Sequence, residues 1–273
     1  MPRQSEPGAL VEAERLVRSR FAASNRADPA GLRAAMHLPM VSLPGPRLSI
    51  RESESALLKS ADFRALASVE SWHSSQMDRF DIRQWSDDKA HCAVAFGRNA
   101  SNGERYADGQ SVYVVTCVDG RWAIQLQSVT LSPIGVGGAD DERAVSAAAD
   151  AFERWIAAQD DVDPKAVRRL VHLPFVDLDG ARLTIHRSAT GMRRDVAARA
   201  TARSWQRSAL HRVEVRERSA YKVTLETEIA RFGSAGSMIA CDRVLAILTA
   251  PMGRWALQVH SSFLTSSEES PAR

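Results

Sequence analysis

The chain has 273 residues, which is more than one typical domain and enough for two domains of about 130 to 140 residues, each with its own core. Its 36 lysines and arginines are nearly balanced by 33 aspartates and glutamates, so the basic excess of a nucleic-acid-binding protein is missing. It has no run of about 18 apolar residues and no apolar signal region, and its three cysteines lack Cys-x-x-Cys spacing. We therefore expect a cytoplasmic protein with no membrane or nucleic-acid partner.

The first predicted elements are two helices. Charged residues separate apolar ones at helical spacing, which predicts an amphipathic helix packed on a core. The apolar residues are Leu10, Ala13, Val17 and Phe21. Next, Asp28 stands at a position suited to an N-cap, and Pro29 follows at the first helical position, where its missing N–H is not needed. A short second helix is expected from there.

The segment after these helices shows that the chain is a duplication. Residues 37–50 alternate apolar and polar side chains, as a strand does, and then turn at Gly45. Residues 172–185 repeat them with nine of fourteen positions identical, at a shift of 135 (172 − 37). The helix pattern and the Asp-Pro cap, now Asp163 and Pro164, also return. Two unrelated segments would almost never match in this way.

A third helical region follows the repeated strand in each half. Residues 53–70 and 188–203 are rich in alanine, arginine and glutamate. The second copy is less regular because it contains Gly191. By the time Trp72 matches Trp205 the shift is 133 (205 − 72), so two residues have been lost between the copies.

The rest of each half is predicted to be strand-rich. Alternating runs such as residues 111–117 and 222–229 suggest long antiparallel strands with two different faces. Asn102-Gly103 and Asp119-Gly120 are typical of hairpin turns. Both halves close on the same strand, because residues 120–128 and 253–261 are identical at six of nine positions.

Three of these repeated segments resemble a known domain family. The His-Leu-Pro strand, the segments at Trp72 and Trp205 and the closing Gly-Arg-Trp strands make each half similar to a nuclear transport factor 2-like domain, also called SnoaL-like or ketosteroid-isomerase-like. The resemblance implies an α+β fold of two tandem cone-shaped domains, each with about three N-terminal helices on a curved antiparallel sheet. We expect the first copy at 1–132, a linker at 133–141, the second copy at 142–266 and a disordered tail at 267–273.

The resemblance implies a function class but not a substrate. The superfamily includes isomerases, dehydratases, cyclases, epoxide hydrolases and non-catalytic adaptors. We therefore expect a small, largely apolar organic ligand in a cone-shaped pocket. One hypothesis is a cofactor-free acid–base enzyme of one of these types. The alternative is a non-catalytic binding or protein-interaction module with degenerate pockets.

Many members of the superfamily pair through the outer faces of their sheets, so the resemblance also implies a partner. The two halves are expected to form an internal pseudo-dimer. The side chains expected at that contact are Tyr113, Gln125, Gln127, Gln258 and His260. Ordinary solvent-facing strand residues are the equally weighted alternative.

Three residues are candidates for chemistry. His37 and His172 stand at equivalent positions where a helix hands over to a strand, and a histidine there could transfer protons or could bond a backbone carbonyl and fix the turn. Asp177 is a candidate base beside His172, because ketosteroid-isomerase-like enzymes keep a carboxylate in this strand. The first copy has Ser42 instead, so an active pocket is expected in the second half. An exposed turn aspartate is the alternative.

Other residues are candidates for binding. Trp72 and Trp205 are placed to wall a ligand pocket, or to fill a core. Arg203 lies in a basic stretch and could hold a carboxylate or phosphate, or face solvent. In the second half Glu226, Glu228 and Asp242 are expected to form a charged ladder with Arg231 and Arg243. A His/Asp pair drawn from His73, Asp78 and His91 is a weaker alternative.

Several motifs are missing from the sequence. It contains no Gly-x-Ser-x-Gly elbow, no Gly-x-Gly-x-x-Gly and no phosphate-binding loop. Its seven histidines never stand two, three or four residues apart, so no local metal site is indicated. We expect neither a metal nor a cofactor.

Overall fold

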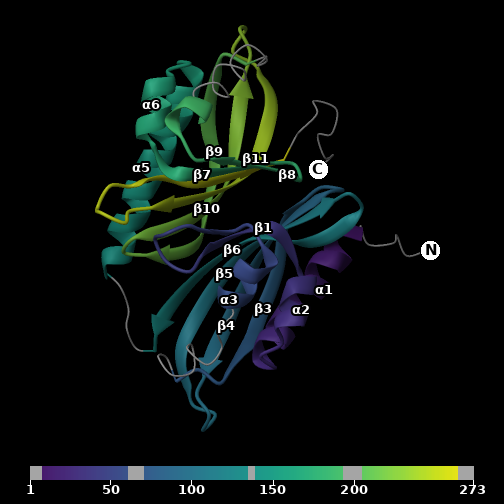
Figure 1. Cartoon of the computed structure of the whole chain (residues 1–273). Helices are drawn as coiled ribbons and strands as arrows, with labels where there is room; N and C mark the ends of the chain where they lie inside the picture. The colour runs from purple at the N-terminus through teal and green to yellow at the C-terminus, as the bar shows by residue number, and fades with distance from the viewer. Residues whose placement is uncertain (1–7, 61–70, 135–138, 193–204, 264–273) are drawn as a thin grey trace, which may run out of the picture. The chain divides into compact units, whose positions relative to one another are not determined.

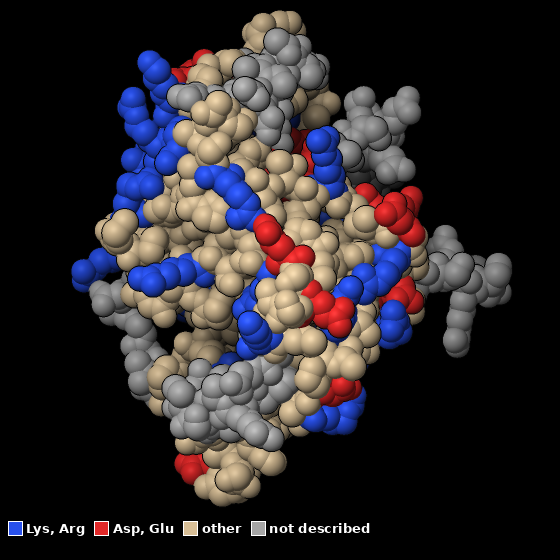
Figure 2. Space-filling model, in the orientation of Figure 1, with Lys and Arg blue, Asp and Glu red and all other residues tan. Residues whose placement is uncertain are grey.

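The computed structural model describes residues 8–60, 71–134, 139–192 and 205–263. The chain divides into two compact units, Met1–Gly137 and Gly138–Arg273 (Figure 1). The expected linker at 133–141 spans the division, and the expected tail at 267–273 lies outside the described residues. Basic and acidic side chains are interspersed over the face drawn in Figure 2, in keeping with their near balance in the sequence.

The helices of the first unit form as their sequences predict. They are α1 (Gly8–Asn25), α2 (Pro29–Ala34) and α3 (Glu54–Ser60). α1 buries Ala13, Val17 and Phe21 and lies across β3, β4 and β6 of the sheet described next. α2 begins at its cap, where Asp28 Oδ1 accepts a hydrogen bond from the backbone N–H of Gly31 at 2.9 Å. The capped start and the apolar stripe account for both helices.

Six strands form the sheet of the first unit. They are β1 (Met36–Leu43), β2 (Ser49–Arg51), β3 (Ser74–Trp85), β4 (Lys89–Asn99), β5 (Arg105–Val118) and β6 (Arg121–Pro133). Their order is β2-β1-β6-β5-β4-β3. The expected sheet was wholly antiparallel, but β1 pairs with β6 in parallel. The sheet is therefore mixed, because the chain returns to β1 with its last strand in the same direction.

The second unit repeats this plan. Its helices are α5 (Ala139–Asp160) and α6 (Pro164–Arg169), and residues 189–192 are also helical. Its strands are β7 (Val171–Asp179), β8 (Arg182–His186), β9 (Arg207–Ser219), β10 (Lys222–Phe232), β11 (Met238–Thr249) and β12 (Ala256–Ser262). The order β8-β7-β12-β11-β10-β9 and the parallel β12–β7 pair match the first unit. Two tandem α+β units are thereby confirmed.

Details shared by the units support the duplication. Asp163 caps α6 as Asp28 caps α2, with its Oδ1 accepting from the backbone N–H groups of Lys165 and Ala166. These N–H groups hold the pKa of Asp163 below its usual value. The Leu38–Pro39 and Leu173–Pro174 peptide bonds are both cis. Equivalent positions of the two units can therefore be compared residue by residue.

Each unit has its core between its helices and one face of its sheet, which we call the helix-facing side. In the first unit this core includes Phe21, Met40, Phe96 and Tyr113. The prediction that Tyr113 lies on the outer face of the sheet is wrong, because Tyr113 belongs to this core. Among the described residues, no helix is long and apolar enough to cross a bilayer.

Candidate functional site

The two repeated histidines occupy equivalent polar clusters. In the first unit His37 Nε2 lies 3.2 Å from the carbonyl oxygen of Thr116, and Arg121 Nη1 lies 3.3 Å from His37 Nδ1. A carbonyl oxygen only accepts and a guanidinium only donates. His37 is therefore neutral, with the hydrogen on Nε2 and the lone pair of Nδ1 facing Arg121.

The second unit reproduces this cluster. His172 Nε2 lies 3.1 Å from the carbonyl oxygens of both Thr249 and Arg254, and Arg254 Nη2 lies 3.1 Å from His172 Nδ1. Burial lowers the pKa of His37 and of His172, and the positive charge of the neighbouring arginine acts in the same direction. Each imidazole thus connects the start of the first strand of its unit to the hairpin formed by the last two strands.

This geometry predicts a pH dependence of stability. With a lowered pKa in the folded state, each histidine binds protons more readily when the chain is unfolded, so the free energy of unfolding should fall as the pH drops below about 6.5. The loss should continue down to the lowered pKa of the folded state. In a His37→Gln, His172→Gln double variant the side-chain amide supplies an N–H donor and an oxygen acceptor but does not titrate. The free energy of unfolding from urea unfolding should then depend less steeply on pH between pH 7.5 and pH 5. An unchanged slope would contradict this explanation.

Asp177 lies in a different cluster from His172. Its Oδ1 is 2.9 Å from Nδ1 of His260, and the two residues are register partners in the parallel β7–β12 pair. Both are buried, with 2% of Asp177 and 6% of His260 exposed. An ionised carboxylate only accepts hydrogen bonds, so His260 carries its hydrogen on Nδ1. The expected pairing of Asp177 with His172 is thus replaced by a buried Asp177–His260 pair.

The Asp177–His260 pair faces the aromatic core of the second unit. The ring centroid of His260 lies 5.0 Å from that of Trp155 on α5, and Trp155 stacks on Phe152 at 5.7 Å. The prediction that His260 lies on an outer sheet face is wrong, because its ring packs against Trp155 on α5. Nε2 of His260 and Nε1 of Trp155 are both buried and have no hydrogen-bond partner among the described residues.

The first unit carries different side chains at these positions. Ser42 and Gln127, also register partners, replace Asp177 and His260. Arg20 (155 − 135) replaces Trp155, and Tyr113 (246 − 133) replaces Ala246, the cross-strand partner of His260. The two helix-facing sides therefore have the same backbone plan and different chemistry.

The other predicted binding residues are spread over the chain. Trp72 is buried and its Nε1 donates to Ser75 Oγ at 3.0 Å, while Trp205 lies under the guanidinium of Arg231 at 4.5 Å. Arg203 lies outside the described residues. None of these contacts involves Asp177 or His260.

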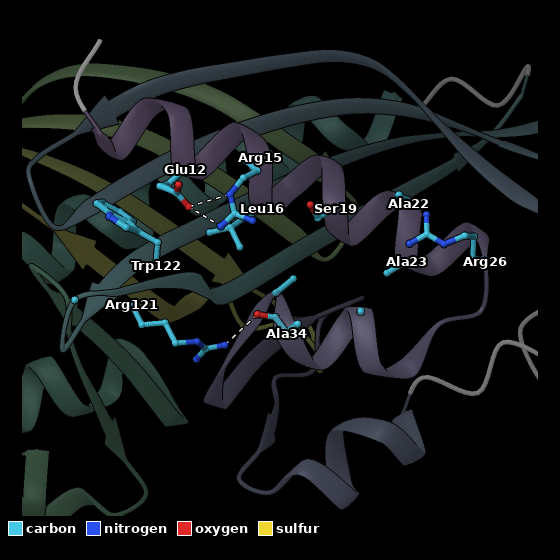
Figure 3. Close-up of a pocket in the computed structure, with 13 residues that line it drawn as sticks. Glu12, Arg15, Leu16, Ser19, Ala22, Ala23, Arg26, Ala34, Arg121 and Trp122 are labelled. Atoms are coloured by element: carbon cyan, nitrogen blue, oxygen red, sulfur yellow. Dashed lines mark hydrogen bonds and ion pairs between the residues drawn. The ribbon is translucent and has the colours of Figure 1, made fainter. Parts of the chain in front are cut away.

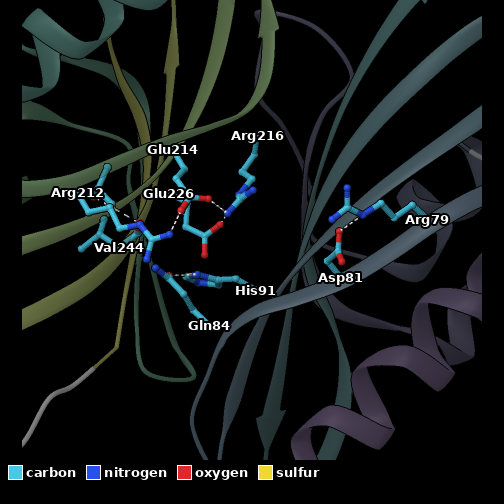
Figure 4. A network of polar contacts seen from close by, with 10 residues as sticks. Arg79, Asp81, Gln84, His91, Arg212, Glu214, Arg216, Glu226 and Val244 are labelled. Atoms are coloured by element: carbon cyan, nitrogen blue, oxygen red, sulfur yellow. Dashed lines mark hydrogen bonds and ion pairs between the residues drawn. The ribbon is translucent and has the colours of Figure 1, made fainter. Parts of the chain in front are cut away.

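The charged ladder expected in the second unit forms only in part. Arg231 Nε lies 2.8 Å from Asp242 Oδ2 across β10 and β11, which confirms that pair. Glu226 pairs instead with Arg216 on β9, which also binds Glu214, and Arg212 binds Glu214 as well (Figure 4). These contacts describe a cross-strand ion network.

The weaker alternative of a His/Asp pair in the first unit is not assembled. His91 Nδ1 lies 2.9 Å from Gln84 Oε1 (Figure 4), Asp78 binds Arg105 at 2.8 Å, and His73 is exposed. Among the described residues, no group of three or more histidine, cysteine, aspartate or glutamate side chains is placed to hold a metal ion.

The first unit also has a surface cleft of about 730 Å³ between α1, α2 and the β5–β6 turn (Figure 3). Leu16, Ala23 and Trp122 supply apolar lining. Its charged groups are already engaged, because Arg15 binds Glu12 and Arg121 binds the carbonyl oxygen of Ala34. The cleft therefore offers shape but few unsatisfied polar groups, in contrast to the site around His260.

No family model and no curated protein sequence matches the chain. Solved structures similar to it include a cystatin-like-fold protein of unknown function from Nostoc punctiforme (13% identity, 46% of this chain, 92% of that one, TM-score 0.39). They also include a nuclear transport factor 2-like protein of unknown function from Shewanella oneidensis (13%, 44%, 97%, 0.36). A third, from Shewanella frigidimarina, is provisionally described as a ketosteroid isomerase (16%, 45%, 98%, 0.36). The fold assignment rests on the strand order and helices of the two units themselves.

Proposed function

We propose that the second unit binds a small, largely apolar organic molecule and acts on it by acid–base chemistry, with His260 as the proton-transferring residue. The observation that carries the proposal is the buried Asp177–His260 pair, whose imidazole Nε2 has no partner among the described residues. Asp177 is a positioning residue. By accepting from Nδ1–H it fixes the tautomer in which Nε2 bears the lone pair.

A second buried group supports the same site. Trp155 Nε1 is a donor without a partner among the described residues. His260 Nε2 is an acceptor that also lacks a partner there. Leaving such groups unsatisfied costs roughly 1–3 kcal/mol each, so their presence in one core needs a reason. A substrate oxygen could accept from the indole N–H while a substrate proton passes to the imidazole. The site would then hold both a base and an electrophilic donor.

The surroundings define the substrate class. Phe152, Phe175 and Trp155 are buried around the pair, so the ligand body would be largely apolar with one or two oxygen functions. Proton transfer needs no redox or group-carrier chemistry, and the reaction would therefore be an isomerisation, dehydration, cyclisation or epoxide opening. Asp177 is thus retained from the sequence prediction, and His260 takes the proton-transfer role that was predicted for His172.

The stacked Phe152–Trp155 pair favours a second candidate, in which the same side chains fill the space beside His260 and the unit is a non-catalytic module. Native mass spectrometry of the chain purified without denaturation separates the two candidates. Retention of a small molecule that a Trp155→Phe variant binds more weakly would favour the ligand site. No retained mass would favour the module.

A chemical probe tests the base directly. 5-Nitrobenzisoxazole is small and aromatic, and a base that removes its C3 proton breaks the N–O bond to give a coloured cyanophenolate. We expect the chain to accelerate this elimination, and a His260→Gln variant to lose about a hundredfold of the rate, as is usual for a general base. His211, which is exposed on β9, supplies the matched control His211→Gln. Equal rates for the chain and His260→Gln would refute the proposal.

A further inference from the structure

The surface cleft of the first unit has a basic rim. Its lining contains three arginines and one acidic side chain, which gives it a net charge of +2 (3 − 1). These residues are Arg15, Arg26, Arg121 and Glu12. Figure 3 shows Arg26 at one end of the cleft, and Arg15 and Arg121 towards the other. A molecule that lies along the cleft would therefore meet positive charge at both of its ends.

Two of these arginines keep donors for a further partner. Arg26 reaches Asp28 only at 3.7 Å, which is longer than a hydrogen bond, and 66% of its side chain is exposed. Arg15 binds Glu12 through Nε and Nη2, and its Nη1 makes no hydrogen bond to the described residues. A guanidinium has five N–H donors, so both groups can bind a carboxylate and keep these contacts.

The floor of the cleft between its charged ends is apolar. Leu16, Ala23 and Ala35 line it and are buried, with 3%, 1% and 3% of their surfaces exposed. The side chain of Trp122 forms a wall at the end near Glu12 (Figure 3). Such a floor binds aliphatic or aromatic side chains, because contact with it removes their apolar surface from water.

The cleft is elongated along α1. The residues of this helix that line it extend from Glu12 to Arg26. They are 14 positions apart (26 − 12), which corresponds to about 21 Å along a helix. An extended peptide covers that length with about six or seven residues. A compact small molecule would reach the arginines at one end only, so the shape of the cleft favours a peptide segment.

The charges at the two ends are specific to the first unit. The counterparts of Arg15 and Arg26 in the second unit are both acidic. They are Asp150 (15 + 135) and Asp161 (26 + 135). The basic ends of the cleft are therefore not a requirement of the shared fold, because the second unit forms the same helix with the opposite charges.

The middle of the cleft also differs between the units. Ser19 and Ala34 line it in the first unit, and both are exposed. Their counterparts are Arg154 (19 + 135) and Arg169 (34 + 135), which have much longer side chains. Exchanges at exposed positions usually change stability little. Arginine at these two positions is therefore a way to fill the cleft of the first unit while its core stays intact.

We infer that this cleft docks an extended acidic segment of a partner protein. Carboxylates at the two ends of the segment would bind Arg26 and Arg15, and apolar side chains between them would lie on Leu16, Ala23 and Ala35. The argument is charge complementarity over the length of the cleft, together with an apolar floor. The cleft belongs to the first unit, so this inference does not rest on the function proposed for the second.

Fluorescence anisotropy of the full chain with a labelled peptide tests the inference. The probe is fluorescein-Asp-Glu-Leu-Ala-Leu-Glu-Asp, and the control is its neutral counterpart fluorescein-Asn-Gln-Leu-Ala-Leu-Gln-Asn. The acidic peptide should bind one site per chain at least about tenfold more tightly than the neutral one. A labelled Asp-Leu-Asp peptide, which is too short to reach both ends, should bind at least about tenfold more weakly than the long acidic peptide.

Variants of the cleft separate docking from general attraction between charges. An Arg15→Asp, Arg26→Asp double variant copies the second unit and should weaken binding of the acidic peptide at least about tenfold. A Ser19→Arg, Ala34→Arg double variant should weaken it by a similar factor, because the added side chains fill the cleft although they add positive charge. Arg18→Gln removes a charge from an exposed position on α1 outside the cleft and should leave binding unchanged.

Several results would overturn the inference, with folding of each variant verified by circular dichroism. They include equal affinity for the acidic and neutral peptides, and affinity that is kept or increased when Ser19 and Ala34 are replaced by arginine. Equal binding of the short peptide would mean that a small anion at one end is sufficient. Self-association of the chain that the same arginine substitutions abolish would identify a second copy as the occupant.

Discussion

Replacing Phe152 by alanine is expected to lower the free energy of unfolding of the second unit by about 3–5 kcal/mol, the usual cost of emptying a buried phenylalanine site. Phe152 is fully buried, belongs to the core under α5 and stacks on Trp155. Removing the ring would leave a cavity that this rigid sheet fills poorly. Urea unfolding followed by circular dichroism would record the loss as an early transition.

The first unit supplies the matched control for this prediction. Val17 (152 − 135) occupies the equivalent position on α1 and is also fully buried. Val17→Ala removes only about two methylene equivalents and should cost about 2 kcal/mol, in the first unit. Because each unit has its own core, the two variants should affect different unfolding transitions. An identical shift of a single transition in both variants would show that the units unfold together.

The second large effect concerns the buried Asp177–His260 pair. Asp177→Ser and His260→Gln should each lower the free energy of unfolding by about 1–3 kcal/mol, because each leaves a buried polar partner unsatisfied. The double variant recreates the Ser42 and Gln127 side chains that the first unit carries at these positions. It should therefore cost clearly less than the sum of the single variants.

A double-mutant cycle from urea unfolding at pH 7 measures this coupling. A coupling energy of about 0.5–3 kcal/mol is the range for residues in contact. Ser262→Ala is a suitable control, because Ser262 Oγ donates to Asp179 two register steps away from the pair. Additive single effects would show that Asp177 and His260 do not stabilise each other.

Much of the fold could be predicted because its signals are local and occur twice. The Asp-Pro caps at Asp28 and Asp163 start short helices in the structure as expected. The turn at Asp119-Gly120 joins β5 and β6, where both residues have positive φ. Such signals depend on a few neighbouring residues and survive without knowledge of the tertiary structure. The duplication then fixed the second unit from the first.

Neither the parallel β1–β6 pair nor the partner of Asp177 could be predicted from local sequence signals. Both depend on contacts between the beginning and the end of a unit, and Asp177 and His260 are 83 residues apart (260 − 177). Alternation shows which residues share a strand face but does not show which strands are neighbours. One signal was present, because Ser42/Asp177 and Gln127/His260 are places where the two copies disagree. Adjacent disagreements on paired strands mark a site whose chemistry changed.

The histidines at 37 and 172 illustrate the opposite case. Their repetition drew attention to them as proton-transfer residues, but in both copies the ring nitrogens contact a carbonyl oxygen and an arginine. A residue that both copies keep, with the same contacts, has a structural role common to both. Here that role is to connect the first strand of each unit to its last strand. Asp177 and His260 occur in one copy only, and the function proposed for the second unit rests on this difference.

The packing of Phe96 over Gly109 constrains how the two copies can change from here. A single exchange of Gly109, the counterpart of Asp242 (242 − 133), for aspartate meets the Phe96 ring at once, whereas the second unit has Ile229 opposite Asp242 and accommodates the acid. Placing an acid at position 109 of the first copy thus requires the ring to be replaced beforehand, so the order of substitutions matters. This contact couples the two positions, so position 109 can take the residue of the second unit only after position 96 has changed.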